Sequence, residues 1–254
     1  MSAELVRDAA RQASPVIGAL QAELPSLVPG YRAKILDGNH LAASAHRLEA
    51  LRHTWAAPLP GQILVVLDQQ RMLASEVVLC EDGHAQERSL LGQVLPCVEP
   101  DDLWIADRHF CTVDFLRGIA ARGGCFVVRQ HGQLKGTLIG ARQSKGAIDT
   151  GKVYEQKLGL VNAQGDTVLL RRITVALHEP TRDGDMEIHV LSNVPMRKAS
   201  AQKLAESDGK RWTIETMFQE LTETLTCEVN ALGYPKAALF GFCLALLAIM
   251  LWSS

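Results

Sequence analysis

The stretch LWIADRHFCTVDFLRGIAARGGCFVVR, residues 103–129, follows the patterns of a strand, a helix and a second strand. Residues 103–106 are a short apolar run typical of a buried strand, and Asp107 comes directly after it. Residues 112–121 have helical spacing and end at a Gly-Gly pair, after which residues 126–129 are again apolar. This order predicts an α/β fold with a carboxylate at a strand end, where ligand chemistry is expected.

Upstream of this stretch, the sequence predicts three more strands. Residues 32–36 read as a brief strand that runs into Asp37-Gly38, a turn signal. Residues 63–67 and 76–80 are apolar and β-branched, and they read as a pair of strands. Alanine, glutamine and leucine then indicate a helix over residues 84–95.

Helical spacing also appears nearer the N-terminus. Residues 2–27 carry apolar positions at helical intervals, and residues 41–52 are helical or irregular in character. The Pro- and Gly-containing residues 57–61 predict a loop.

Downstream of the stretch, the character of the sequence changes twice. Residues 133–194 consist of short β-like pieces separated by glycines, and the clearest strands are 168–175 and 187–191. Helix resumes near Ala199, with a predicted interruption at 207–209 and a strong helix over 210–225. We therefore expect a β-rich insertion followed by helices.

The last long helical pattern is unusually apolar. Residues 237–252 form a run of sixteen without a charge. A membrane span needs roughly 18 to 20 such residues, so we expect a core helix packed behind the helix of Glu215 and no membrane contact. In that preceding helix, Ile214, Met217 and Phe218 define a buried stripe. Trp104 and Trp212 are expected to be core aromatics.

Composition limits the class of protein. The chain has 254 residues, of which 47% are apolar, and a formal net charge of -2. Its first residues lack the apolar stretch of a secretory signal, which favours the cytoplasm. The six cysteines form no C-x-x-C pair and read as free thiols: Cys80, Cys97, Cys111, Cys125, Cys227 and Cys243.

One segment is markedly basic despite the net negative charge. Residues 129–182 contain nine Lys and Arg residues against four Asp and Glu residues. Such a segment is a candidate for contact with a phosphate backbone, because Lys and Arg release counterions from DNA. A solvated face of a β-rich segment explains the same charge equally well.

Three carboxylates carry the chemical hypothesis. Phosphodiester cleavage with two divalent metal ions needs hard oxygen ligands around ions roughly 3.5 to 4 Å apart. Asp37, Asp107 and Glu215 supply such a set if the sheet places the two strand ends side by side. Arg211 lies four residues before Glu215, on the same helix face, a spacing that most often marks a surface ion pair.

Three pieces of the sequence, in order, closely resemble the acidic motifs of bacterial insertion-sequence transposases of the DDE type. They are ILDG at 35–38, LWIADRHF at 103–110 and RWTIETMF at 211–218. The branch resembled has a Tyr-Arg-Glu-Lys signature around its catalytic Glu, and the resemblance runs from about residue 32 to 251.

The resemblance implies a ribonuclease-H-like core, a mixed sheet flanked by helices, interrupted by a β-rich insertion before the last catalytic helix. The expected division is an N-terminal helical segment at 1–30, the first part of the core at 31–132, the insertion at 133–195 and the last part of the core at 196–254.

The resemblance also implies functional roles. Asp37, Asp107 and Glu215 would be the catalytic residues and would bind two Mg²⁺ ions, for which Mn²⁺ substitutes. Arg211 would contact DNA phosphate. The implied partners are double-stranded DNA, as transposon ends and target DNA, and a second copy of the chain on that DNA, in the cytoplasm at the nucleoid.

Two positions differ from the family's signature. Asp208 stands where the Tyr is expected, and Thr222 stands where the Lys is expected. Both family residues are thought to grip DNA. The alternative hypothesis is therefore a truncated, catalytically impaired remnant that acts only as a DNA-binding protein.

Overall fold

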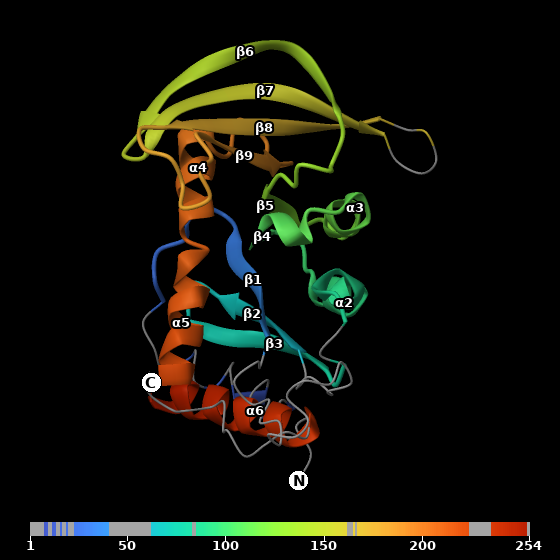
Figure 1. Ribbon diagram of the computed structural model, residues 1–254, viewed down its shortest axis with the longest axis vertical. Helices are drawn as coiled ribbons and strands as arrows, with labels where there is room; N and C mark the ends of the chain where they lie inside the picture. The colour runs from blue at the N-terminus through green and yellow to red at the C-terminus, as the bar shows by residue number, and fades with distance from the viewer. Residues whose placement is uncertain are drawn as a thin grey trace, which may run out of the picture. The chain divides into compact units, whose positions relative to one another are not determined.

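The computed structural model divides the chain into two compact units (Figure 1). The first unit comprises Met1–Pro25, Leu36–Val94 and Thr213–Ser254, and the second comprises Ser26–Ile35 and Leu95–Trp212. The structure describes residues 8–9, 12–13, 16, 19, 23–40, 62–82, 85–161, 165, 167–223 and 235–252. The helical segment and the loop expected at 41–52 and 57–61 lie outside these residues.

The first unit is built on three strands in the order β3-β2-β1. β2 (Gln62–Asp68) and β3 (Leu73–Cys80) are antiparallel, and every residue of β2 is buried. A strand that is buried on both faces of its sheet has no solvent-facing side. This explains why apolar and polar residues do not alternate along β2. β1 (Arg32–His40) contributes its residues from Leu36 onward to this unit.

Two helices contact these strands, and a third packs against one of the two. α2 (Glu87–Val94) and α6 (Pro235–Trp252) both contact β3. Phe242 of α6 packs against Phe218 of α5 (Trp212–Glu223), with ring centroids 6.2 Å apart. The expected packing of α6 behind α5 is confirmed, and no helix among the described residues has the length and apolar character needed to cross a membrane.

In the second unit, β4 (Asp102–Ala106) and β5 (Cys125–Arg129) are parallel neighbours joined by α3 (Val113–Ala121). Thr112 caps α3, because its side chain accepts a hydrogen bond from the Phe115 N–H at 3.3 Å. The strand, helix and strand predicted for this stretch are confirmed, and so is the α/β class.

The remaining strands of the second unit are antiparallel, in the order β5-β9-β8-β7-β6. They are β6 (Thr137–Ile148), β7 (Gly151–Val161), β8 (Thr167–Leu177) and β9 (Glu187–Ser192). β6 and β7 pair with two shifts of register, and Gly140 and Gly146 in β6 have positive φ angles of 75° and 94°. Glycine adopts this backbone conformation at little cost, so both positions suit the irregular pairing.

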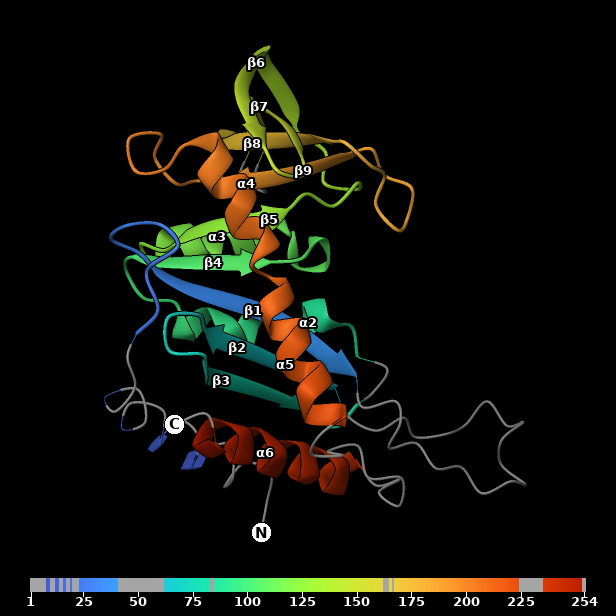
Figure 2. The ribbon, with the colours of Figure 1, turned by 90° about the vertical axis from the view of Figure 1, so that its left-hand side faces the viewer.

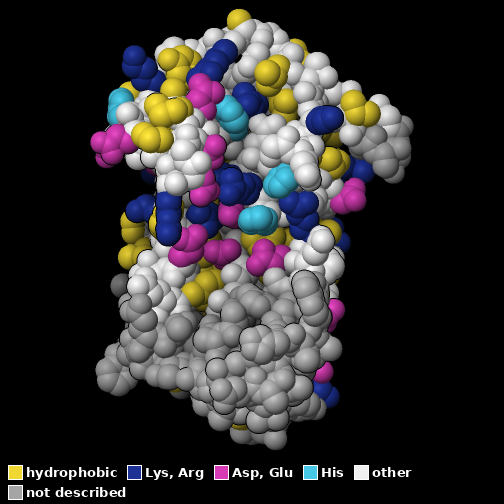
Figure 3. Space-filling view, viewed as in Figure 1, with side chains coloured by type: hydrophobic (Ala, Val, Ile, Leu, Met, Phe, Trp, Pro, Cys, Tyr) yellow, Lys and Arg dark blue, Asp and Glu magenta, His cyan; other side chains and the backbone are white. Residues whose placement is uncertain are grey.

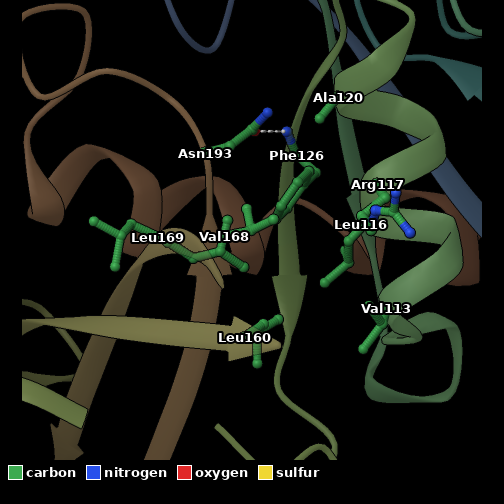
Figure 4. Close-up of a pocket in the computed structure, with 10 residues that line it drawn as sticks. Val113, Leu116, Arg117, Ala120, Phe126, Leu160, Val168, Leu169 and Asn193 are labelled. Atoms are coloured by element: carbon green, nitrogen blue, oxygen red, sulfur yellow. Dashed lines mark hydrogen bonds between the residues drawn. The ribbon is translucent and has the colours of Figure 1, made fainter. Parts of the chain in front are cut away.

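Helices α3 and α4 cover opposite faces of this sheet. α4 (Ala201–Gly209) packs against β5 and β6 to β9 (Figure 1 and Figure 2). Side chains alternate along β5, so Arg129 reaches α4 whereas Phe126 points toward α3. On the α3 side, Phe126, Leu116 and Leu160 line an apolar cavity of about 230 Å³ (Figure 4). Asn193 beside it accepts a hydrogen bond from the Phe126 N–H at 2.8 Å.

A buried ion pair ties β7 and β8 to the segment that leads into α4. Arg171 Nε donates to Glu155 Oε1 at 2.6 Å, and the two side chains are 11% and 9% exposed. The Nη1 group of Arg171 also donates to the carbonyl oxygens of Val194 and Ala199 at 3.0 and 2.9 Å. One guanidinium therefore holds two strands and the approach to α4 together.

Three expectations were wrong in detail. The strand β1 continues through Asp37-Gly38 to His40, so there is no turn at that pair. Helix α4 continues through residues 207–209, and the break before α5 falls at Lys210 and Arg211 instead. Trp212 is 60% exposed, because it opens α5 away from the stripe of Ile214, which is fully buried. Trp104 is fully buried, as expected.

Candidate functional site

Asp107 lies at the carboxyl end of β4, as the sequence predicts. It caps the short 3-10 turn Arg108–Phe110, and its side chain accepts a hydrogen bond from the Arg108 N–H. The strand behind it is buried throughout, which fixes where the carboxylate leaves the sheet. Asp107 itself is half-buried and so remains reachable from solvent.

Arg129 is the last residue of β5 and lies next to Asp107. Ala106 and Val128 are paired in the parallel register of β4 and β5, so the residues that follow them emerge side by side. The Nε group of Arg129 donates to Asp208 Oδ2 at 3.2 Å. Asp208 lies in the last turn of α4, which begins after its N-cap residue Ser200.

Asp208 is more deeply buried than Asp107, the other acidic residue of this site. Its side chain is 6% exposed, and burial raises the pKa of its carboxyl group. Arg129 and Arg211 oppose that rise in pKa, whereas the charge of Asp107 adds to it. The second oxygen, Oδ1, is buried and has no hydrogen-bond partner among the residues that the structure describes.

Arg211 lies in the two-residue break between α4 and α5. It is 6% exposed, and its backbone N–H donates to the Asp208 carbonyl oxygen at 3.1 Å. Arg211 is therefore not part of the helix that carries Glu215, because α5 starts one residue after Arg211. The structure instead gathers Asp107, Arg129, Asp208 and Arg211 within the second unit.

The other two predicted carboxylates belong to the first unit. Asp37 is half-buried within β1, and its Oδ1 accepts a hydrogen bond from the Gly38 N–H at 2.9 Å. Gly38 lies close to the Glu87 carboxylate, and a Cβ atom at this position would require the Glu87 side chain to move. Glu215 is half-buried in the first turn of α5, where a negative charge is favoured by the helix dipole.

Sequence reasoning missed Arg129 and Asp208 as site residues. Arg129 was counted only within a basic stretch, and Asp208 only as a departure from a signature. The signal for Arg129 was its place at the end of the strand that follows the strand of Asp107. Among the residues that the structure describes, no three His, Cys, Asp or Glu side chains form a group that could hold a metal ion.

The basic stretch at 129–182 forms part of the sheet β6 to β9. The Arg142 guanidinium lies 4.0 Å from the Tyr154 ring centroid and donates to Glu187 Oε1 at 2.8 Å. On the face shown in Figure 3, Lys and Arg side chains are interspersed with Asp, Glu and His side chains. The positive charge of this stretch is thus partly compensated within the sheet. The cysteines that the structure describes are free thiols, as expected.

His189 is expected to make the stability of this sheet depend on pH. Burial lowers its pKa, and the charge of Arg172 lowers it further, while Glu187 partly opposes both. A lowered pKa in the folded state means that the unfolded chain binds more protons below its own pKa of about 6.5. We expect the free energy of unfolding to fall between pH 7.5 and pH 5, and to fall less in His189→Gln. Urea denaturation at both pH values measures this, and equal losses in the two proteins would refute it.

Comparison with known proteins adds the family. The sequence model of the family described as "Transposase DDE domain" matches residues 53–251, a range that contains Asp107 and Glu215 and begins after Asp37. No curated protein matches the chain.

Among solved structures, a cryo-EM structure of the piggyBac transposase synaptic complex with hairpin DNA aligns with a TM-score of 0.42 and 11% identity. The alignment covers 87% of this chain and 48% of that one, so the chain spans about half the length of that transposase. A TM-score this low is too weak to assign a shared fold. The family model, in contrast, matches well over half of the sequence, and the chain belongs to the transposase DDE domain family.

Proposed function

We propose that this chain is the catalytic part of an insertion-sequence transposase, of the branch with a Tyr-Arg-Glu-Lys signature. It would cut DNA at the transposon ends and join the freed 3′-hydroxyl to target DNA. The observation that carries the proposal is the half-buried Asp107 at a strand end beside Arg129, in a chain of the transposase DDE domain family.

The proposed architecture is a ribonuclease-H-like core at 31–132 and 196–254, preceded by a helical segment at 1–30. The parallel pair β4 and β5 with α3 supports a core of this kind. The antiparallel strands β6 to β9 support a β-rich insertion at 133–195.

Asp37, Asp107 and Glu215 are the proposed catalytic residues and ligands of two Mg²⁺ ions, with Mn²⁺ as a substitute. The proposal rests on the type of donor, because hard divalent cations prefer carboxylate oxygens. Bound ions of this kind lower the pKa of an attacking water and offset charge on the phosphate. The carboxylates would hold this site, while Arg211 would add positive charge that favours the DNA phosphate.

The proposed partner is double-stranded DNA, both as transposon ends and as target. The chain would act as a homodimer assembled on that DNA. It would work in the cytoplasm, at the nucleoid. An arginine at a strand end beside a carboxylate, as Arg129 is beside Asp107, favours a polyanionic substrate over a neutral one.

Incubation of the purified protein with supercoiled plasmid in Mg²⁺ or Mn²⁺ tests the activity. We expect nicked circles that appear only when a divalent metal is present. A gel-shift assay of the same plasmid in EDTA measures binding separately. Binding without nicking in either metal would overturn the assignment as an enzyme.

The alternative is a truncated, catalytically impaired transposase remnant that acts only as a DNA-binding protein. Two positions favour it, since Asp208 and Thr222 replace the signature residues of the resembled branch. A remnant would shift the plasmid in the gel and leave it supercoiled.

A further inference from the structure

Burial of the Asp208 carboxylate costs desolvation free energy, and the contacts of this group only partly offset that cost. One carboxylate oxygen accepts a hydrogen bond from Arg129 at 3.2 Å, and the other is buried without a hydrogen-bond partner in the described part of the chain. A buried ion pair roughly breaks even against apolar residues only when its remaining lone pairs are satisfied. Asp208 also lies in the last turn of α4, where the helix dipole disfavours a negative charge. Stability alone therefore does not explain an aspartate at this position.

The same contact leaves most of the Arg129 guanidinium available. Within the part of the chain that the structure describes, its bond to Asp208 is the one hydrogen bond of this side chain, and it uses Nε. The two Nη groups carry four further N–H donors in a rigid planar fork. The Arg129 side chain is 25% exposed, whereas the Asp208 side chain is 6% exposed, so part of the arginine is accessible to solvent.

The position of the fork suits a phosphate. Asp107 follows β4 and Arg129 is the last residue of the adjacent parallel strand β5, and each comes one residue after the paired Ala106 and Val128. The Arg129 guanidinium is already held through Nε. It therefore loses less side-chain entropy when its Nη groups bind an anion than an unrestrained arginine would lose. Phosphodiester oxygens match these Nη groups, because two parallel N–H groups can bind them together.

We propose that Asp208 is a positioning residue that holds Arg129 so that its two Nη groups bind a DNA phosphate next to Asp107. This inference rests on the proposed function and names the residue pair that grips the substrate there. Arg211 neighbours the same carboxylate and helps to keep it negatively charged. The competing explanation is an ion pair that only stabilises the fold.

A double-mutant cycle separates the two explanations. The variants are Asp208→Leu, which removes the acceptor at similar volume, Asp208→Asn, which keeps an acceptor oxygen, and Arg129→Gln. The readouts are plasmid nicking in Mn²⁺ and the binding of a fluorescent DNA duplex in EDTA, followed by anisotropy at several salt concentrations. Circular dichroism and urea midpoints select conditions in which every variant is folded.

We expect Asp208→Leu to slow nicking by roughly tenfold, as is typical for residues that orient a functional side chain. Asp208→Asn should retain more activity than Asp208→Leu, because an oxygen still faces Nε. Arg129→Gln should lower the slope of log affinity against log salt by about 0.9, the value for one lost phosphate contact. In the Arg129→Gln background, Asp208→Leu should cause no further loss.

The matched control is Glu155→Gln, which alters a buried carboxylate paired with another arginine, Arg171. Glu155→Gln should change nicking and DNA binding by the same factor in the wild-type background and in the Arg129→Gln background. Equal losses from Asp208→Leu in both backgrounds, or a change in urea midpoint alone, would overturn the positioning role. If the wild-type protein binds DNA without nicking it, the proposed enzyme fails, while the cycle measured in EDTA still decides the role of Asp208.

Discussion

Asp107→Asn is expected to lower the rate of Mn²⁺-dependent plasmid nicking by roughly a thousandfold. Metal-assisted stabilisation of the transition state amounts to several kcal/mol, and about 1.4 kcal/mol corresponds to a factor of ten. The Asp107 carboxylate leaves a buried strand in a fixed direction, so no neighbouring residue replaces it easily. Asparagine caps a helical turn about as well as aspartate, and the cap of Arg108–Phe110 should survive the change.

Asp114→Asn is the matched control for this prediction. Asp114 is an exposed acid in the first turn of α3, in the same unit, and its replacement makes the same change in charge. It should nick at close to the wild-type rate. Nicking that persists in Asp107→Asn at a rate near that of Asp114→Asn would remove Asp107 from the catalytic site.

Arg171→Met is expected to lower the free energy of unfolding by about 3 to 5 kcal/mol, the cost of leaving a buried charge without its partner. The variant leaves the Glu155 carboxylate buried and also removes the donor to the Val194 and Ala199 carbonyl oxygens. Urea denaturation followed by circular dichroism measures the change.

The exposed pair of Arg142 and Glu187 provides the comparison. Its side chains are 35% and 38% exposed, so solvent screens their attraction. Arg142→Met should cost less than about 1 kcal/mol, as is usual for exposed ion pairs. Similar losses in Arg171→Met and Arg142→Met would show that burial does not set the strength of the Arg171 pair.

The sequence was most informative where burial dictates composition. The fully buried β2 and β4, and the helix between β4 and β5, were predictable because strands without solvent contact become continuous apolar runs. The strand β6 was harder to see, because it is largely exposed and its bulges interrupt the alternation of side chains. The turn expected at Asp37-Gly38 was wrong because sheet pairing overrides local turn preference.

The candidate site was only partly predictable, for a related reason. Asp107 follows an apolar strand, and this local pattern was sufficient to identify it. The contact between Arg129 and Asp208 joins residues 79 positions apart. Neither local propensity nor periodicity reports such a contact. Asp208 was expected to interrupt a helix, whereas tertiary packing continues α4 through it.

The irregular pairing of β6 also bears on how the protein avoids aggregation. β6 ends the strand order of its sheet, and an exposed edge strand offers unpaired backbone groups to other chains. Its two register shifts and its positive-φ glycines, Gly140 and Gly146, break the flat template that intermolecular β-pairing needs. Lys145 adds charge repulsion between like edges. The register shifts and glycines that make β6 difficult to predict from the sequence therefore also protect the folded protein from edge-to-edge association.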